Sequence, residues 1–386
     1  MNKVGWRLST HSSTVTIVLI GLIVVVLLSL SACKPKTTSE NNKTTVETTA
    51  TTTDSSSASG INTDQASAER LANQLWQQGL DRIRILAKKS SALQDSIQKL
   101  LAEPSTQNLN TAQTEWKGVF LLYQELLPFL FIEHSSLSNS LTQWRFALAA
   151  WPLQPGYLDS YDVYIQSGIV NDITLPLSRE SLRKQHGLTD IEEATLGLYA
   201  IEYLLWGDKE TSSPKRLSQQ SKVPLAFEQA GLKVNELPNN RRRQLLELQS
   251  QILVEDIASL AKQWQEKGIL SALFSPLSPK DKLVAFHTGL SNNLNEIKLL
   301  LAYDIGEQHV QKNSYPSRFN SQRRQAIKKQ LDAIESLYFS NISGHKSKGA
   351  LSLAEVLLSL DEKKNTLEAI SLVRNKLGEI EKTNNN

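Results

Sequence analysis

The chain has one cysteine among its 386 residues, so a disulfide within the chain is excluded. It also has little excess charge, because 42 Lys and Arg stand against 39 Asp and Glu, for a formal net charge of +3. This balance gives no bias toward nucleic acids as partners. We expect the basic run Arg241-Arg242-Arg243 to be a solvated helix start rather than an anion site.

Recognised catalytic motifs are also missing. The sequence has no H-E-x-x-H helix, glycine-rich phosphate loop, nucleophile elbow or cysteine-based site. His287 shares a predicted helix with Glu296 and Asp304, and we interpret it as an ordinary helical residue rather than a ligand. The remaining histidines are scattered, so the case for an enzyme is weak.

Only the N-terminus has a long apolar run. Lys3 and Arg7 precede apolar residues 15–30, which end in Leu30-Ser31-Ala32-Cys33. This order is typical of an export signal, and its end resembles a bacterial lipoprotein box. We therefore predict a signal peptide over residues 1–32 and a membrane anchor through lipid on Cys33, the alternative being an uncleaved signal anchor. No later stretch is apolar for long enough to cross a bilayer.

The remaining chain is predicted to be all-α. Residues 33–64 are rich in Thr, Ser and Asn, which is typical of a disordered tether. From Gln65 onward the apolar residues recur with helical periodicity and no strand alternation is convincing. We predict an N-terminal bundle over residues 65–210, a linker over 211–239 and a C-terminal bundle over 240–386. The expected helices are 65–102, 108–131, 136–148, 189–206, 240–267, 279–309, 321–340 and 362–382.

One carboxylate in an apolar helix is the strongest candidate for function. Glu202 lies within Gly197-Leu-Tyr-Ala-Ile-Glu-Tyr-Leu-Leu-Trp-Gly207, which Thr189 and Glu192 precede with the pattern of a capping box. A buried carboxylate without a partner would cost on the order of several kcal/mol. Glu202 is therefore expected to be protonated, salt-bridged, facing a polar cavity or bound to a metal.

The segment from Gly197 to Gly207 resembles the signature of the imelysin-like family, G-x-H-x-x-E followed by an aromatic residue and Leu-Leu-Trp-Gly. It departs from that pattern at Tyr199, which takes the place of the histidine. A second resemblance runs from Trp144-Arg145-Phe146 through Trp151-Pro152 to Gly156-Tyr157-Leu158-Asp159. Trp116 with Tyr123 resembles an aromatic helix of the first bundle.

The resemblance implies an all-helical fold of two related bundles, and a site interpreted either as a metallopeptidase centre or as part of bacterial iron uptake. Tyr199 has three interpretations: a core aromatic, a hydrogen-bond donor to Glu202 or another acid, or a phenolate ligand of ferric iron, with Asp159 or Glu133 completing the shell. Iron is the candidate metal ahead of zinc, because a catalytic zinc needs about three protein ligands and a bound water. Arg145 is the expected charge partner of Glu202.

The sequence thus predicts an envelope lipoprotein with a binding cleft. Lys34, together with the family resemblance, favours the periplasmic face of an outer membrane. The function we expect is a non-catalytic binding component linked to iron or metal uptake. The alternatives are a metallopeptidase of the imelysin type and a metal-free scaffold that recruits a protein partner in the envelope. The residues expected at the cleft are Tyr199, Glu202, Arg145, Trp151, Tyr157 and Asp159.

Overall fold

The all-α prediction is confirmed. The computed structural model describes residues 64–161, 163–207, 213–307, 320–339 and 352–383, so the predicted signal peptide, Cys33 and all but the last residue of the tether lie outside it. No strand occurs in these ranges, where the only β-type pairing is an isolated bridge between Tyr161 and Tyr164. None of the helices described is long and apolar enough to cross a bilayer.

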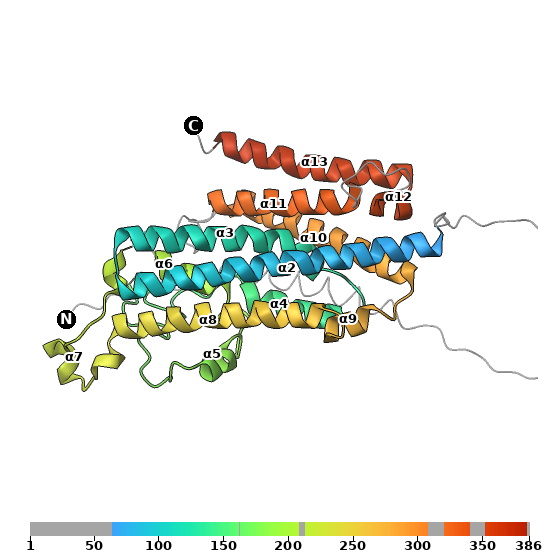
Figure 1. Cartoon of the computed structure of the whole chain (residues 1–386). Helices are drawn as coiled ribbons and strands as arrows, with labels where there is room; N and C mark the ends of the chain where they lie inside the picture. The colour runs from blue at the N-terminus through green and yellow to red at the C-terminus, as the bar shows by residue number, and fades with distance from the viewer. Residues whose placement is uncertain (1–63, 162, 208–212, 308–319, 340–351, 384–386) are drawn as a thin grey trace, which may run out of the picture. The chain divides into compact units, whose positions relative to one another are not determined.

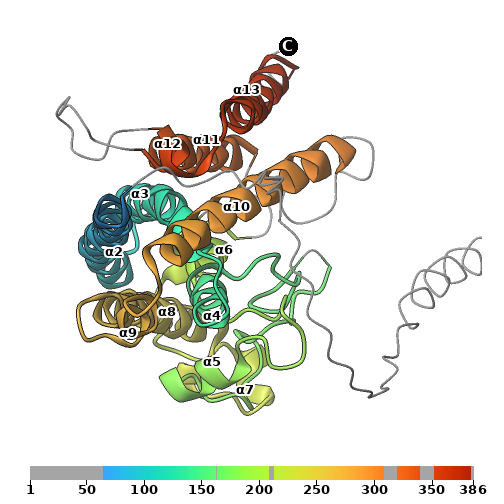
Figure 2. The same cartoon turned by 90° about the vertical axis from the view of Figure 1, so that its right-hand side faces the viewer.

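Five long helices form most of the core (Figure 1). They are α2 (Gln65–Ala102), α3 (Thr106–Leu130), α8 (Pro238–Trp264), α10 (Pro279–Glu307) and α11 (Asn320–Phe339). Helix α2 packs along both α3 and α8, and α3 also packs against α10 and α11. Figure 2 shows α2 and α3 nearly end-on, with α10 crossing them obliquely.

Helix α2 shows why the sequence forms this core. Its buried side chains recur every three or four residues from Ala68 to Leu101, which gives one apolar face over its whole length. The Asp64 carboxylate accepts the amide hydrogen of Ala66 at 2.8 Å and caps the first turn. Each fully buried leucine such as Leu75 stabilises the fold by about 1.5–3 kcal/mol through removal of apolar surface from water.

The junction of α2 with α8 is aromatic. Trp76 and Trp264 stack with ring centroids 4.1 Å apart, and Phe274 stacks on Trp76 at 4.2 Å. Each indole donates to the other tryptophan's backbone carbonyl, at 3.1 Å from Trp76 and 2.9 Å from Trp264. These reciprocal bonds satisfy both buried N–H groups and fix the register of the two helices.

Further elements surround these five helices. They are α4 (Ser138–Ala149), α5 (Arg179–Gln185), α6 (Leu198–Trp206), α7 (Leu225–Gln229), α9 (Ile269–Phe274), α12 (Leu353–Leu357), α13 (Leu360–Thr383) and the 3₁₀ turns Pro214–Leu217 and Val234–Glu236. The division into two bundles separated by residues 211–239 stays a prediction. The described residues from 64 to 383 fall within one compact unit.

The helix expected over residues 189–206 begins nine residues late, at Leu198. Thr189 donates to the side chain of Glu193 instead of capping a helix, and residues before Gly197 form turns. Gly197 has φ 89°, and a Cβ there would lie 2.8 Å from the carbonyl oxygen of Leu148. The chain must approach the end of α4 so closely here that a continuous helix through position 197 is excluded.

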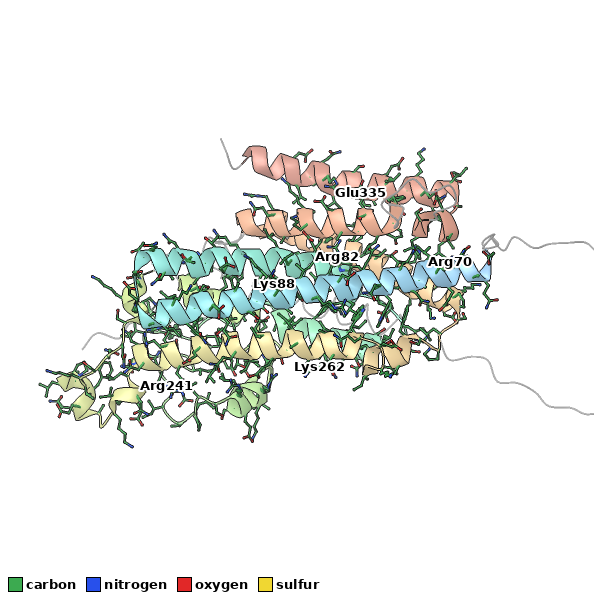
Figure 3. All side chains as sticks on the ribbon, in the orientation of Figure 1. Arg70, Arg82, Lys88, Arg241, Lys262 and Glu335 are labelled. Atoms are coloured by element: carbon green, nitrogen blue, oxygen red, sulfur yellow. The ribbon has the colours of Figure 1, made fainter. Side chains whose placement is uncertain are left out.

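The prediction of a solvated arginine run is also wrong. Arg241, at the start of α8 (Figure 3), is 5% exposed and Arg242 is 7% exposed. The Arg241 guanidinium donates to four carbonyl oxygens of the irregular segment before α5, those of Ile169, Val170, Asp172 and Leu175. Buried carbonyls without helical partners need donors, and a guanidinium supplies five N–H groups.

Candidate functional site

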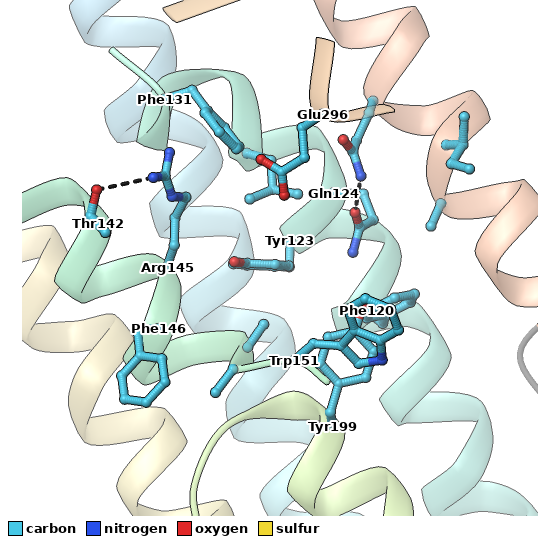
Figure 4. Close-up of a pocket in the computed structure, with 16 residues that line it drawn as sticks. Phe120, Tyr123, Gln124, Phe131, Thr142, Arg145, Phe146, Trp151, Tyr199 and Glu296 are labelled. Atoms are coloured by element: carbon cyan, nitrogen blue, oxygen red, sulfur yellow. Dashed lines mark hydrogen bonds between the residues drawn. The ribbon is translucent and has the colours of Figure 1, made fainter. Parts of the chain in front are cut away.

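A pocket of about 270 Å³ lies where α3, α4, α6, α10 and α11 meet (Figure 4). Its position follows from the packing of α3, which contacts all four of the other helices. Helix α3 contributes Phe120, Tyr123, Gln124 and Leu127, whose spacing places them on one helical face. The pocket therefore has a continuous α3 wall faced by side chains from distant parts of the chain.

One end of the pocket is aromatic. Tyr199 makes edge contacts with Phe120, with ring centroids 5.5 Å apart, and tilts toward Trp151 at 6.4 Å. Trp116 stacks behind Phe120 at 4.8 Å, and its indole donates to the carbonyl oxygen of Leu198 at 2.8 Å. This bond attaches the start of α6 to α3, so the Tyr199 ring is held in the wall by neighbours on both sides.

Arg145 lies at the polar end, where two hydrogen bonds and one ring fix its guanidinium. It donates to the carbonyl oxygen of Leu130 at 3.3 Å and to Thr142 Oγ1 at 3.0 Å, and it lies 3.8 Å from the centre of the Phe131 ring. Leu130 is the last residue of α3, whose final carbonyls lack helical partners. Arg145 therefore satisfies a carbonyl at a helix C-terminus while its charge faces the pocket.

Two further groups complete the polar end. Burial raises the pKa of the Tyr123 hydroxyl, as does the neighbouring Tyr199, and Arg145 opposes this change. Desolvation raises the pKa of the Glu296 carboxyl, and Arg145 again opposes it. Glu296 remains exposed at the pocket's edge, whereas Tyr123 is 3% exposed. Figure 4 shows the Tyr123 hydroxyl directed toward Arg145.

Buried amides close the side formed by α11. Gln330 donates to Gln124 Oε1, and the Asn293 amide donates to Gln330 Oε1 at 3.2 Å. All three side chains are at most 5% exposed. Because the Gln124 oxygen accepts from Gln330, its amide nitrogen is oriented away from Gln330 and remains a donor beside the pocket.

Glycines at both ends of α6 allow this short helix to fit. Gly197 permits the close approach to Leu148 described above, and Gly207 ends the helix with φ 77°. A Cβ at Gly207 would lie 2.4 Å from Nη1 of Arg216. The second glycine therefore makes room for a guanidinium that binds Asp159, as described below.

Comparison with known proteins identifies the family. The model of the family described as Imelysin (Peptidase M75) matches residues 79–385, most of the chain. The chain belongs to the imelysin family. Its structure is similar to the crystal structure of an iron-regulated protein A precursor from Parabacteroides distasonis ATCC 8503, with a TM-score of 0.52 and 15% sequence identity. The match covers 83% of this chain and 90% of that one. No curated protein matches the sequence.

The imelysin signature contributes one side chain to the pocket. Among residues 197–207, all of which the structure describes, Tyr199 alone lines it. Glu202, one turn later, is 1% exposed and lies within the packed side of α6. Of the predicted cleft residues, Tyr199, Arg145 and Trp151 come together around the pocket. Arg145, expected to pair with Glu202, instead binds Leu130 and Thr142.

Tyr157 and Asp159 lie away from this pocket. The Tyr157 hydroxyl donates to the carbonyl oxygen of Gln185 at 3.2 Å, and burial, with Glu193 nearby, raises its pKa to about 12. Asp159 is fully buried and binds Arg242 and, at 2.9 Å, Arg216. Asp159 therefore joins the loop after α4 to α8.

The two carboxylates expected to complete a ferric shell, Asp159 and Glu133, already have partners. The Asp159 oxygens are engaged by two guanidinium groups, and Glu133 accepts a hydrogen bond from Ser138. In the ranges that the structure describes, no three His, Cys, Asp or Glu side chains are grouped to hold a metal ion. Inside the pocket, the raised pKa of Tyr123 opposes phenolate formation at that hydroxyl, and Arg145 would repel a cation.

Sequence reasoning missed Tyr123 and Gln124 as pocket residues, and it took Glu296 only as a neighbour of His287. The spacing of Phe120, Tyr123, Gln124 and Leu127 was a usable signal for one polar and aromatic face of α3. Nothing in the sequence shows that Glu296, from a helix more than 160 residues later, faces them.

Proposed function

We propose that this imelysin family member is a non-catalytic binding protein of the cell envelope that contributes to iron uptake. The observation that supports this most directly is the place of Tyr199, where the family has its histidine. Its ring is part of the aromatic wall beside Phe120 and Trp151. The signature position therefore contributes surface to a binding pocket, and it contributes no imidazole to a metal centre.

The link to iron comes from the family resemblance and from the similar crystal structure, whose name describes an iron-regulated protein. The envelope location comes from the sequence, in which residues 1–33 have the form of a lipoprotein signal. Replacing Cys33 by Ser should move the protein from the outer-membrane fraction to the soluble fraction. Equal membrane association of both forms contradicts the lipid anchor.

A peptidase is disfavoured by the chemistry of the pocket. Metal-assisted hydrolysis needs a Lewis acid with an open position and a base for the attacking water. The charge at the end of α3 is the Arg145 guanidinium, which would repel a divalent cation in the pocket. We therefore expect no peptide hydrolysis from the purified full chain with added zinc or iron.

The function is tested in cells by blocking the pocket. Ala149 lines it, so Ala149→Phe fills part of the space. A matched control is Ala258→Phe on the exposed face of α8. Cells lacking the gene should take up labelled iron more slowly under iron limitation. The wild type and Ala258→Phe should restore uptake, and Ala149→Phe should not. Normal uptake without the gene contradicts the proposal.

Recruitment of a protein partner is a second candidate, favoured by one exposed loop. Val163, Tyr164 and Ile165 are 74%, 68% and 73% exposed. Consecutive apolar side chains with such exposure mark interaction surfaces more often than scattered single residues do. Affinity capture with the wild type and with the double variant Val163→Ser/Ile165→Ser tests this candidate. A partner that the wild type captures and the variant does not supports recruitment.

A further inference from the structure

We propose that the pocket binds an α-amino acid with an aromatic or large apolar side chain, as the zwitterion. The inference rests on the proposed binding function and names the class of ligand. Three features carry it: a fixed cation with hydrogen-bond donors beside it, an anion near that cation, and an aromatic surface at the other end.

The cation is positioned for a carboxylate. Within the part of the chain that the structure describes, Arg145 forms no ion pair, and the groups that it binds, Leu130 O and Thr142 Oγ1, are neutral. Its stack on Phe131 keeps the guanidinium in one orientation. A positive charge that is already oriented and not neutralised binds an anion with little further loss of side-chain entropy.

Two neutral donors lie beside that charge. The Tyr123 side chain is 3% exposed, and its hydroxyl has no hydrogen-bond partner among the described residues. A hydroxyl removed from water without a partner is unfavourable, so its orientation toward the pocket indicates a ligand or water there. The Gln124 amide nitrogen adds a second donor.

Glu296 supplies the opposite charge close to the first. Both side chains line the pocket, and Arg145 opposes the rise in the pKa of Glu296 that desolvation causes, yet the two form no salt bridge within the described ranges. The carboxylate and ammonium of an α-amino acid are attached to the same carbon, so they need opposite charges within one small pocket, and Arg145 and Glu296 both line this one. A simple carboxylate would leave Glu296 without a partner and would be repelled by it.

The apolar end and the volume set the size of the side chain. Phe120, Trp151 and Tyr199 present ring surface opposite the charges. At about 30 Å³ per water, the pocket of about 270 Å³ holds on the order of ten non-hydrogen atoms. This is enough for one amino acid with a ring or a long apolar side chain and too little for a folded peptide or a large chelator.

Calorimetric titration of the purified full chain tests the proposal with three probes. L-Phenylalanine carries both charges, 3-phenylpropionate lacks the ammonium group and 2-phenylethylamine lacks the carboxylate. We expect L-phenylalanine to bind at one site and each truncated probe to bind at least about tenfold more weakly, because each leaves either Glu296 or Arg145 without an opposite charge in the pocket. Equal binding of all three probes, or no binding of L-phenylalanine at millimolar concentration, overturns the assignment.

Variants locate the binding. Tyr123→Phe and Glu296→Gln should each weaken L-phenylalanine binding by about tenfold or more. The matched controls are Tyr338→Phe, whose hydroxyl bonds His287 outside the pocket, and Glu266→Gln on the exposed surface. Equal losses in variants and controls contradict binding in this pocket. The titration does not depend on iron uptake. If L-phenylalanine does not bind but Ala149→Phe still fails to restore iron uptake in cells, the ligand class is rejected and the proposed function stands.

Discussion

Asp159 offers the most direct test of how the segment before α5 is held in place. Its side chain is fully buried and accepts from Arg242 and, at 2.9 Å, from Arg216, while Arg242 has 8% of its own side chain exposed. Asp159→Asn keeps the volume but removes the negative charge between two guanidinium groups. Removing one partner of a buried ion pair costs about 3–5 kcal/mol, because the remaining charge is left without compensation.

The expected loss is measured by urea unfolding followed by circular dichroism. The matched control is Glu255→Gln, which breaks an ion pair with Arg179 whose side chains are 46% and 50% exposed. An exposed pair of this kind contributes about 0–1 kcal/mol. We therefore expect a much lower transition midpoint for Asp159→Asn and almost no change for Glu255→Gln. Equal effects would refute the view that this cluster stabilises the fold.

The same cluster of Asp159, Arg216 and Arg242 makes the stability of the fold depend on pH. Burial alone would raise the pKa of Asp159, but the hydrogen bond and charge of Arg242, with Arg216, hold it below the usual value. A carboxyl with a depressed folded pKa stabilises the protein above its unfolded pKa of about 3.9, and this stability is lost as pH falls through the folded value. The wild type should therefore lose stability below about pH 4 more steeply than Asp159→Asn, as acid titration of ellipticity would show.

Three more changes test other parts of the site. Gly207→Ala should destabilise the fold by about 1–3 kcal/mol, because φ is 77° and the new Cβ would contact Arg216; thermal unfolding measures this, and an unchanged midpoint is inconsistent with the structure. Burial lowers the pKa of His186, so stability should fall as pH drops below about 6.5, and a flat profile of melting temperature from pH 7 to about 5 would contradict this. Tyr123→Phe should leave the free energy of unfolding nearly unchanged, whereas Tyr338→Phe should lower it by about 0.5–1.5 kcal/mol because the bond to His287 is lost. If urea unfolding shows the larger loss for Tyr123→Phe, the Tyr123 hydroxyl is not free.

The long helices were predictable because each has a continuous apolar face. The predicted range 65–102 matches α2 at both ends, and 279–309 begins where α10 begins. Such stripes depend on local spacing, which the sequence contains directly. The same logic failed at residues 189–197, where Thr189 and Glu192 have the pattern of a helix start. There the close approach of Gly197 to the end of α4 decides the conformation, and that contact joins distant residues.

The candidate site was predictable only in part, because contacts between distant residues assemble it. Arg145, Trp151 and Tyr199 were found through motifs that resemble those of a family. Tyr123 and Glu296 lie on α3 and α10, and only the packing of those helices brings them together. The arginines at the start of α8 show the same limit, since a basic run predicts solvent exposure until the backbone carbonyls and the Asp159 carboxylate that it binds are known.

The structure explains why this chain can match the rest of the signature while carrying tyrosine at position 199. Gly197 lets α6 begin against α4, and Gly207 ends it where Arg216 reaches Asp159, so both glycines serve packing. Tyr199 is the one residue from Gly197 to Gly207 whose side chain lines the pocket. A change at position 199 therefore alters the chemistry of the pocket, while the two glycines still meet the packing requirements of the fold. A match to the rest of the signature is therefore evidence for the imelysin fold, and we predict that ligand binding depends on the side chain at position 199 and on the pocket groups of α3, α4 and α10.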